Sequence, residues 1–488
     1  MSSRYIISVR DHFAPYIVGA SLISLGLFSM LFTLIAFLLQ EPIIGFIITG
    51  VFGALIGGLL IRLGKASPDP SRSDGLTGIL VLWLALPIFG AIPYAVSGGM
   101  SPLNALFESM SGFTATGATV ITDFTSIPSS LFLWRSLSQW LGGIGIIVIF
   151  IAVFPQLAIA GRQLFFAESP GPTEERLTPR LRTTAYAVLI IYVSLTVLCA
   201  IAYLLGGMSL FEAINHALTT VAAGGFSPSS ASFQQASPAL TWIAITFMIL
   251  AGTNFALQYR ALIGRPRDIW RDTEFRAYLI IILAAGTALT VILIGKYAPL
   301  EALRHGIFQA VSILTTTGYA STDFAAWPLP ARMVLMVLMF IGGTAGSAAG
   351  GIKIVRWLII ARHTVREVKL SLHPRAILPV RLGGRIIPEE VMRSVMAFTT
   401  LFVGLFAAST IVLVFFGADL VTSVSAAIAT VGNIGPGLGL VGPLAHYADL
   451  HPVSRILLIF NMYAGRLEVV TVFVVFTSRW WLSPLFRK

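Results

Sequence analysis

The sequence predicts an all-α polytopic membrane protein with four helix–pore loop–helix units in a pseudo-fourfold arrangement, preceded by an extra pair of helices. Hydrophobic residues make up 56% of the 488 residues and charged residues only 11%, and the mean hydropathy is +0.87. A soluble domain typically carries about 25% charged residues, so this composition indicates a lipid environment. Apolar runs of about 20 residues, the length of a spanning helix, recur along the chain, and four shorter apolar segments interrupt them.

About ten apolar segments are long enough to span a bilayer. We expect these spans near residues 14–39, 42–62, 77–97, 131–158, 183–206, 238–262, 277–295, 331–361, 394–416 and 453–478. The first run is too long for the apolar core of a signal peptide, so it is expected to remain as a spanning helix. Ten crossings leave both termini on the same side of the membrane.

The charge distribution predicts which side that is. Of the 32 Lys and Arg residues, 26 lie in the stretches 1–13, 61–76, 161–183, 260–276, 353–393 and 479–488, which all fall on the side of the termini. Lys and Arg collect in cytoplasmic loops, so both termini are expected in the cytoplasm. The formal charge of +11 is explained by the same rule, and no nucleic-acid partner is expected.

The composition also argues against metal and disulfide chemistry. Cys199 is the single cysteine, and the seven histidines are scattered. No disulfide within the chain and no thiolate metal site is therefore possible. We expect no cofactor, and membrane lipid is an expected partner because of the apolar spans.

Four short apolar segments lie in external connections between spans, near 102–116, 209–223, 303–317 and 418–431. They are too short to cross a bilayer, and irregular backbone at membrane depth is tolerated only beside protein or a water-filled cavity. Each ends in small or hydroxyl residues followed by a glycine, and aligning these glycines pairs Gly117, Gly224, Gly318 and Gly432. A polar residue stands nine positions before each glycine: Glu108, Asn215, Gln309 and Ser423.

This repeat predicts a potassium selectivity filter. Backbone carbonyls replace the water shell of potassium in such filters, and glycine permits the backbone conformations that point carbonyls inward. The segment Thr315–Tyr319 is closest to the T-V-G-Y-G filter of potassium channels. Close helix packing by small residues is the competing explanation for any one copy. The candidate ion-binding residues, with potassium as substrate and as the only bound metal, are Ala115, Thr116, Gly117, Ala222, Ala223, Gly224, Thr316, Thr317, Gly318, Thr430, Val431 and Gly432.

A glycine-rich stretch in the eighth span and an arginine in the tenth are gate candidates. Five glycines in ten residues disfavour a regular helix, so we expect an irregular loop beneath the filter, with packing by small residues as the alternative. Lys353 either anchors this loop or is the first cytoplasmic charge. Arg466 is costly at mid-membrane and should face protein or water, either as an electrostatic barrier in the pore or in an ion pair. The candidate gate residues are Gly342, Gly343, Thr344, Ala345, Gly346, Ser347, Gly350, Gly351, Lys353 and Arg466.

The expected units follow from these segments. The helix pair occupies residues 1–70, and the four pore units occupy 71–165, 166–265, 266–375 (with the gating loop) and 376–488.

Four further stretches carry a resemblance to a known family: Gly142–Gly145, Ala167–Pro172, Gly342–Lys353 and Gly465–Glu468. With the four loops, they make the sequence similar to the TrkH/KtrB superfamily of potassium transporters over nearly its whole length. The extra helix pair resembles the TrkH type. The resemblance implies potassium uptake across a bacterial inner membrane, a homodimer, and a cytoplasmic nucleotide-binding regulatory subunit of the TrkA type.

Three alternatives stay open. Potassium flux could be passive or coupled to protons or sodium as symport. An inverted-repeat secondary transporter would also use broken helices, but its repeats would alternate in direction. A membrane enzyme would need converging nucleophiles, acids or metal ligands, and no such arrangement accompanies His216 or His305.

Overall fold

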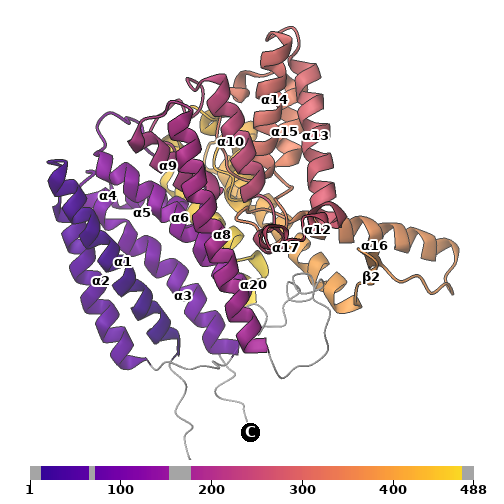
Figure 1. Cartoon of the computed structure of the whole chain (residues 1–488), viewed down its shortest axis with the longest axis horizontal. Coiled ribbons are helices and arrows are strands. Elements are labelled where there is room, and N and C mark those ends of the chain that lie inside the picture. Colours follow the sequence, from indigo (N-terminus) through magenta and orange to yellow (C-terminus); the bar gives the residue numbers. More distant parts are fainter. Residues whose placement is uncertain (1–12, 65–71, 153–176, 475–488) are drawn as a thin grey trace, which may run out of the picture.

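The computed structural model describes residues 13–64, 72–152 and 177–474, and the chain there is almost entirely helical (Figure 1). The first part contains α1 (Phe13–Leu38), α2 (Ile44–Leu63), α3 (Arg72–Gly90), α4 (Ile92–Val96), α5 (Pro102–Phe113) and α6 (Ser129–Ala152). The second contains α8 (Leu177–Leu205), α9 (Leu210–Val221), α10 (Pro238–Ala251), α11 (Phe255–Leu262), α12 (Arg267–Arg271), α13 (Thr273–Leu293), α14 (Pro299–Leu314) and α15 (Leu329–Leu338). The last contains α16 (Ile354–Leu372), α17 (Glu389–Phe415), α18 (Leu420–Val431), α19 (Pro452–Arg466) and α20 (Val469–Val474).

Within the described residues, six helices are long and apolar enough to cross a membrane, and a bent pair raises the number to seven. They are Phe13–Leu38, Ile44–Leu63, Asp74–Val96, Ala185–Leu205, Thr273–Leu293 and Glu389–Phe415. Each coincides with a predicted span. The predicted segment 131–158 begins as α6, and its residues 153–158 lie outside the described part of the chain, as do 475–478 of the tenth segment and the stretch Ala167–Pro172.

The N-terminal helix pair is held together by glycines, as expected for helices in lipid, where small residues allow close backbone approach. A Cβ built on Gly53 of α2 would lie 2.8 Å from the Leu22 carbonyl oxygen of α1, and one on Gly26 of α1 would lie 3.0 Å from the Gly50 carbonyl oxygen. Larger side chains would separate the two helices. The pair stands at one edge of the molecule, in indigo in Figure 1.

Two predicted spans are wrong as continuous helices, and a third is broken as predicted. The segment 238–262 forms α10 and α11, which are bent by 99° at a break of three residues. The segment 331–361 forms α15 and the start of α16, separated by an irregular loop, and 453–478 breaks after Arg466. The second break is the one that the glycine-rich sequence predicts. The other two occur at Gly252 and at Glu468, which adopts a positive φ of 64°.

The four short predicted segments are helices α5, α9, α14 and α18, each in a connection between two other helices. Side-chain caps start three of them. Ser101 accepts a hydrogen bond from the Asn104 amide, Ser209 forms a capping box with Glu212, and Asp419 accepts from the Val421 and Thr422 amides. The Thr422 hydroxyl and these amides hold the pKa of Asp419 below its usual value.

The remaining short helix, α14, has Ala298 as its N-cap residue (φ −60°, ψ 150°), and Ala298 offers no side-chain acceptor. Replacing Ala298 by serine should stabilise the protein by about 1 kcal/mol, because a serine cap satisfies a free helix amide. The midpoint of thermal unfolding in detergent measures this. Ser101→Ala is the matched control and should lower the midpoint by a similar amount; a lowered midpoint for Ala298→Ser contradicts the prediction.

Beyond α16 the chain forms a small hairpin that the sequence analysis does not anticipate. Strands β1 (Arg381–Leu382) and β2 (Arg385–Ile386) pair in antiparallel register. Gly383 and Gly384 make the turn, both with positive φ, as a two-residue hairpin turn requires. Helix α16 and this hairpin project sideways from the bundle (Figure 1).

Candidate functional site

All four short helices end in the same backbone motif. The C-cap residue of each helix is followed by a residue with a positive φ between 49° and 57°, and the next amide donates to a carbonyl five residues back. These four bonds are 2.8 to 2.9 Å long and join Thr116 to Ser111, Gly224 to Thr219, Thr317 to Ser312 and Ile434 to Ala429. A left-handed residue in this place is a common helix ending. The residues that carry it are Ala115, Ala223, Thr316 and Asn433.

A glycine with positive φ follows two residues later in each loop. The values are 86° at Gly117, 74° at Gly225, 80° at Gly318 and 99° at Gly435. A side chain is strained in this region, which explains the glycine at all four positions. Each loop therefore has two left-handed residues separated by one ordinary residue.

These glycines also bring the four loops together. A Cβ built on Gly117 would collide with the carbonyl oxygen of Gly224 in the second loop, and one on Gly225 would collide with that of Thr317 in the third. A Cβ on Gly318 would collide with the carbonyl oxygen of Ile434, and one on Gly435 would lie 2.6 Å from that of Thr116. Each loop thus contacts the next, and the fourth returns to the first.

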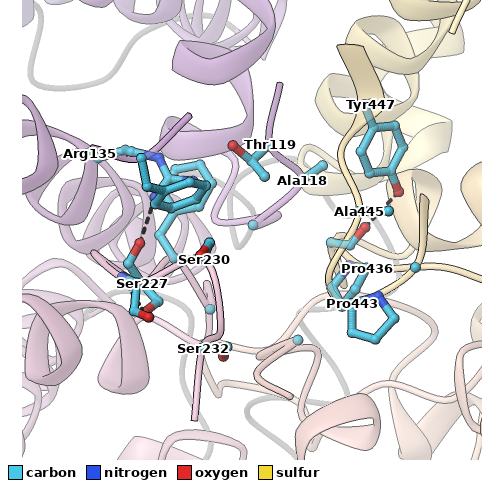
Figure 2. Close-up of a pocket in the computed structure, with 18 residues that line it drawn as sticks. Ala118, Thr119, Arg135, Ser227, Ser230, Ser232, Pro436, Pro443, Ala445 and Tyr447 are labelled. Carbon is cyan, nitrogen blue, oxygen red and sulfur yellow. Dashed lines mark hydrogen bonds between the residues drawn. The ribbon is translucent and has the colours of Figure 1, made fainter. Parts of the chain in front are cut away.

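A cavity of about 60 Å³ opens on this ring (Figure 2). All four positive-φ glycines contribute to its lining. Arg135 and Ser227 lie on one side of it, and Pro436 and Tyr447 lie on the other. The Tyr447 hydroxyl donates to the carbonyl oxygen of Gly435 at 2.6 Å and thereby fixes the fourth loop.

The structure corrects the register of two loops. The predicted residues of the first and third loops, Ala115–Gly117 and Thr316–Gly318, carry the left-handed motif. In the second loop the motif lies one residue later than predicted, on Ala223–Gly225, so that Ala222 is the helix cap. In the fourth it lies three residues after the prediction, on Asn433–Gly435.

The fourth-loop error has a clear physical reason. Thr430 and Val431 are still helical, and Gly432 has a right-handed φ of −80° as the C-cap of α18. Any residue can adopt this right-handed conformation. Gly432 therefore does not mark a position that requires glycine, and aligning the loops on it gives the wrong register. The signal that could have found the register is Asn433, since Asn is one of the few residues that readily adopt the left-handed conformation.

Buried polar side chains of the short helices contact the segment that follows the positive-φ glycine of each loop. Glu108 accepts from the Val120 amide at 2.9 Å, Gln309 accepts from the Ser321 amide at 3.0 Å, and Ser425 accepts from the Leu438 amide at 2.8 Å. In the second unit, His216 Nε2 lies 3.1 Å from the Ser227 hydroxyl. In the second and fourth units, the residues that make these contacts are therefore His216 and Ser425, and not Asn215 and Ser423, which stand nine positions before the aligned glycines.

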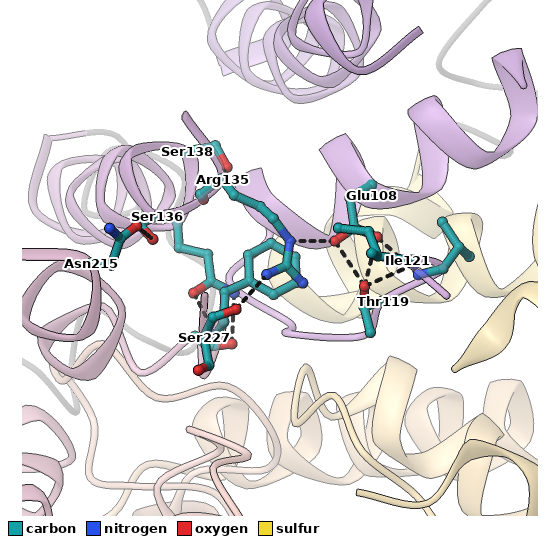
Figure 3. Close-up of polar contacts among 12 residues, drawn as sticks. Glu108, Thr119, Ile121, Arg135, Ser136, Ser138, Asn215 and Ser227 are labelled. Carbon is teal, nitrogen blue, oxygen red and sulfur yellow. Dashed lines mark hydrogen bonds and ion pairs between the residues drawn. The ribbon is translucent and has the colours of Figure 1, made fainter. Parts of the chain in front are cut away.

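A buried ion pair is specific to the first loop (Figure 3). Arg135 Nε donates to Glu108 at 2.5 Å, and its Nη1 donates to the carbonyl oxygen of Ser227 at 3.0 Å. The guanidinium also lies 3.5 Å from the centre of the Phe226 ring. One side chain thus fastens the first loop to the second. The sequence analysis does not single out Arg135 as a site residue.

Replacing Glu108 by alanine should destabilise the protein by about 3 kcal/mol, because a buried arginine loses its counter-charge. Thermal unfolding in detergent checks this. Glu108→Gln keeps an acceptor for Val120 and should lose less. Glu301, exposed in the first turn of α14, is the control, and its replacement by alanine should have no effect. Equal midpoints for both alanine variants would contradict the prediction.

The glycine-rich stretch 342–351 forms an irregular loop packed against the break between α10 and α11. The Thr344 amide donates to the Gly252 carbonyl oxygen at 3.0 Å, and the Phe255 amide donates to that of Gly346 at 3.1 Å. The Gly350 amide donates to the Thr316 hydroxyl at 2.6 Å. The loop therefore touches a residue of the third left-handed motif directly. Its remaining predicted members are Gly342, Gly343, Ala345, Ser347 and Gly351.

Lys353 and Arg466 both contact this loop. The Lys353 ammonium donates to the carbonyl oxygen of Ala349. Arg466 is 4% exposed and donates to the carbonyl oxygens of Ala348 at 3.0 Å and Gly142 of α6 at 3.3 Å. Its described contacts are thus with backbone carbonyls. Glu468 instead forms an ion pair with Arg356 of α16, with both carboxylate oxygens 2.7 Å from Nη2.

A multi-pass bundle of apolar helices, with uncharged loops meeting around a cavity, defines a membrane transport protein. The comparison with known families agrees. The chain belongs to the TrkH family of cation transport proteins, whose family model matches residues 43–481. It is therefore a transporter and not an enzyme.

Individual relatives support this membership. The chain is 37% identical to the Trk system potassium uptake protein TrkH of Vibrio parahaemolyticus over 84% of this chain and 86% of that protein. It is 36% identical to the protein of the same name from Halomonas elongata over 94% and 98%. The crystal structure of the potassium transporter TrkH from Vibrio parahaemolyticus is similar with a TM-score of 0.86 and 33% identity, over 96% of this chain and 99% of that one.

Proposed function

We propose that this protein takes up potassium across a bacterial inner membrane through a selectivity filter built from the four loops. The observation that carries the proposal is the closed series of loop contacts, in which each positive-φ glycine faces a carbonyl oxygen of the next loop. Rings of backbone carbonyls replace the hydration shell of potassium in filters of this kind. The relatives described above as potassium uptake proteins give the substrate.

The filter residues in this proposal follow the register of the structure. They are Ala115–Gly117, Ala223–Gly225, Thr316–Gly318 and Asn433–Gly435. The first and third loops add paired hydroxyls, since Thr114 and Thr116 lie 2.7 Å apart and Thr315 and Thr317 lie 2.8 Å apart. The second loop has no hydroxyl in its motif, so we propose that discrimination against sodium and rubidium is incomplete.

The proposal includes the full pseudo-fourfold arrangement. Each unit comprises a helix, a short helix with its loop, and a second helix, with bounds at 71–165, 166–265, 266–375 and 376–488, after the N-terminal pair 1–70. The distribution of Lys and Arg supports a cytoplasmic location for both termini.

The loop 342–351 is the gate in this proposal, because it contacts Thr316 and lies against α18, where a Cβ on Gly350 would be 2.5 Å from the Gly432 carbonyl oxygen. Lys353 anchors the loop, and Arg466 adds positive charge beside it. The family resemblance supports a homodimer with a TrkA-type nucleotide-binding regulatory subunit that would move this loop.

Flux of potassium into vesicles that contain the purified protein tests the function. Vesicles loaded with potassium and placed in potassium-free medium develop an inside-negative potential that should drive uptake of tracer rubidium. Vesicles loaded with the same concentration of sodium should take up much less. Equal sodium and potassium flux would overturn the proposed filter. Uptake that appears only with an imposed proton or sodium gradient would favour coupled symport over passive conduction.

A further inference from the structure

We propose that Glu274 is a positioning residue that clamps the loop 342–351 in its closed shape and links it to the cytoplasmic connection before α13. The inference rests on the proposed function of this loop as a gate. It concerns a residue that neither the loop sequence nor the filter motif points to.

The position of Glu274 is set by the start of α13. Asp272 caps this helix by accepting the Phe275 amide at 2.6 Å, and Glu274 lies in its first turn. Its carboxylate is directed away from α13 to another part of the chain. Oε1 accepts the Ala345 amide at 2.8 Å and the Val355 amide at 3.0 Å.

A single oxygen atom thereby joins a residue within the glycine-rich stretch to a residue that follows it. Ala345 lies in the first half of the loop, and Val355 is the second residue of α16. The loop ends are also paired by backbone bonds, from the Gly342 amide to Ile352 at 2.8 Å and from the Ile354 amide to Gly343 at 3.2 Å. Glu274 adds a side-chain link from outside the loop to the amides of both Ala345 and Val355.

The place of Glu274 beside the start of α16 suits this role. The first amides of a helix have no partner within the helix and carry its positive dipole end. At the start of α16, the N-cap residue Lys353 provides no side-chain cap. Glu274 supplies the missing acceptor from a different helix, and its Oε1 has the lone pairs to accept two amides at once.

The link runs to the cytoplasmic side. Only one residue, Asp272, separates α12 (Arg267–Arg271) from α13. A displacement of this connection would therefore pull Glu274 away from the amides of Ala345 and Val355. Arg466 holds the middle of the same loop at Ala348, so the two residues act at separate points.

Tracer rubidium flux into vesicles without any regulatory subunit tests the clamp. Glu274→Ala should raise basal flux roughly tenfold, because the hydrogen bonds to the Ala345 and Val355 amides are both lost. Glu274→Gln keeps an Oε1 acceptor for both amides and should remain within about threefold of the wild type. Glu390→Ala is the matched control, an exposed acidic residue in the first turn of α17, and should leave the flux unchanged.

A second measurement separates opening of the loop from general damage. Cys199 is the single cysteine of the chain. In a Cys199→Ala background, a cysteine replacing the buried Ser347 should react with a charged thiol reagent several-fold faster when Glu274 is alanine, and at the wild-type rate when it is glutamine.

Unchanged flux and unchanged labelling in Glu274→Ala would overturn the clamp, as would a glutamine variant equal to the alanine variant. Arg466→Ala in the same vesicles distinguishes the two proposals. If Arg466→Ala raises flux and Glu274→Ala does not, the clamp fails and the gate stands. If neither the Arg466 variant nor any Glu274 variant alters flux, the gate itself fails.

Discussion

Replacing Gly435 by alanine should reduce the preference for potassium over sodium at least tenfold. An alanine Cβ would meet the Thr116 carbonyl oxygen at 2.6 Å while the backbone holds a φ of 99°. Either the fourth loop moves away from the first or the Thr116 carbonyl turns, and both changes disrupt the coordination of a dehydrated ion. A tenfold change corresponds to about 1.4 kcal/mol, which is less than the combined strain and collision are expected to cost. Rubidium uptake in vesicles with competing sodium measures the preference.

Gly417 provides a matched control in the same unit. It has a similar φ of 92°, and a Cβ there would meet nothing within 4 Å. Gly417→Ala should therefore lower the stability by about 1 kcal/mol through backbone strain and leave ion preference unchanged. Native ion preference in Gly435→Ala, or an equal loss in Gly417→Ala, would show that Gly435 has no special place in the filter.

Replacing Arg466 by alanine should raise basal potassium flux about tenfold or more. The side chain is buried and donates to Ala348 of the loop 342–351 and to Gly142 of α6. Its removal frees the loop and also deletes a positive charge that repels cations, and each 1.4 kcal/mol removed from the barrier gives a tenfold rise. Tracer flux in vesicles measures it, with size-exclusion elution as the check on assembly.

Arg466→Lys separates the two effects. Lysine keeps the charge but lacks the planar set of donors that reaches two carbonyl oxygens at once. Low flux in this variant would assign the barrier to charge, and high flux would assign it to the loop contact. Wild-type flux in the assembled alanine variant would contradict both.

The sequence predicted more of the first and third loops than of the other two. In the first and third loops a single glycine follows hydroxyl residues, so the alignment has one solution and it is the register of the structure. In the second loop, Gly224 and Gly225 are adjacent, and only the positive φ of 74° at Gly225 separates them. In the fourth loop, Gly432 ends a helix in an ordinary conformation. Aligning the loops on Gly432 instead of Gly435 therefore gives the wrong register.

For the proposed gate, too, the sequence predicted one feature and not another. Five glycines in ten residues predicted an interruption of the helix, because glycine disfavours helix wherever it stands. No sequence pattern indicates that Glu274, about 70 residues earlier, accepts the amides of Ala345 and Val355. Arg135 is a similar case, since its partners Glu108 and Ser227 come from two different units.

The sequence by itself determined the membrane environment, the positions of the long spans and the four short helices. These are local properties, because lipid offers no hydrogen bonds and each span must be apolar and long enough on its own. Tertiary structure alone decided which carbonyl faces which glycine, where two of the helices break, and which carboxylate holds the loop 342–351. Most of those features depend on the approach of segments about 70 to 320 residues apart, as Gly435 and Thr116 illustrate, and no local pattern encodes such a contact.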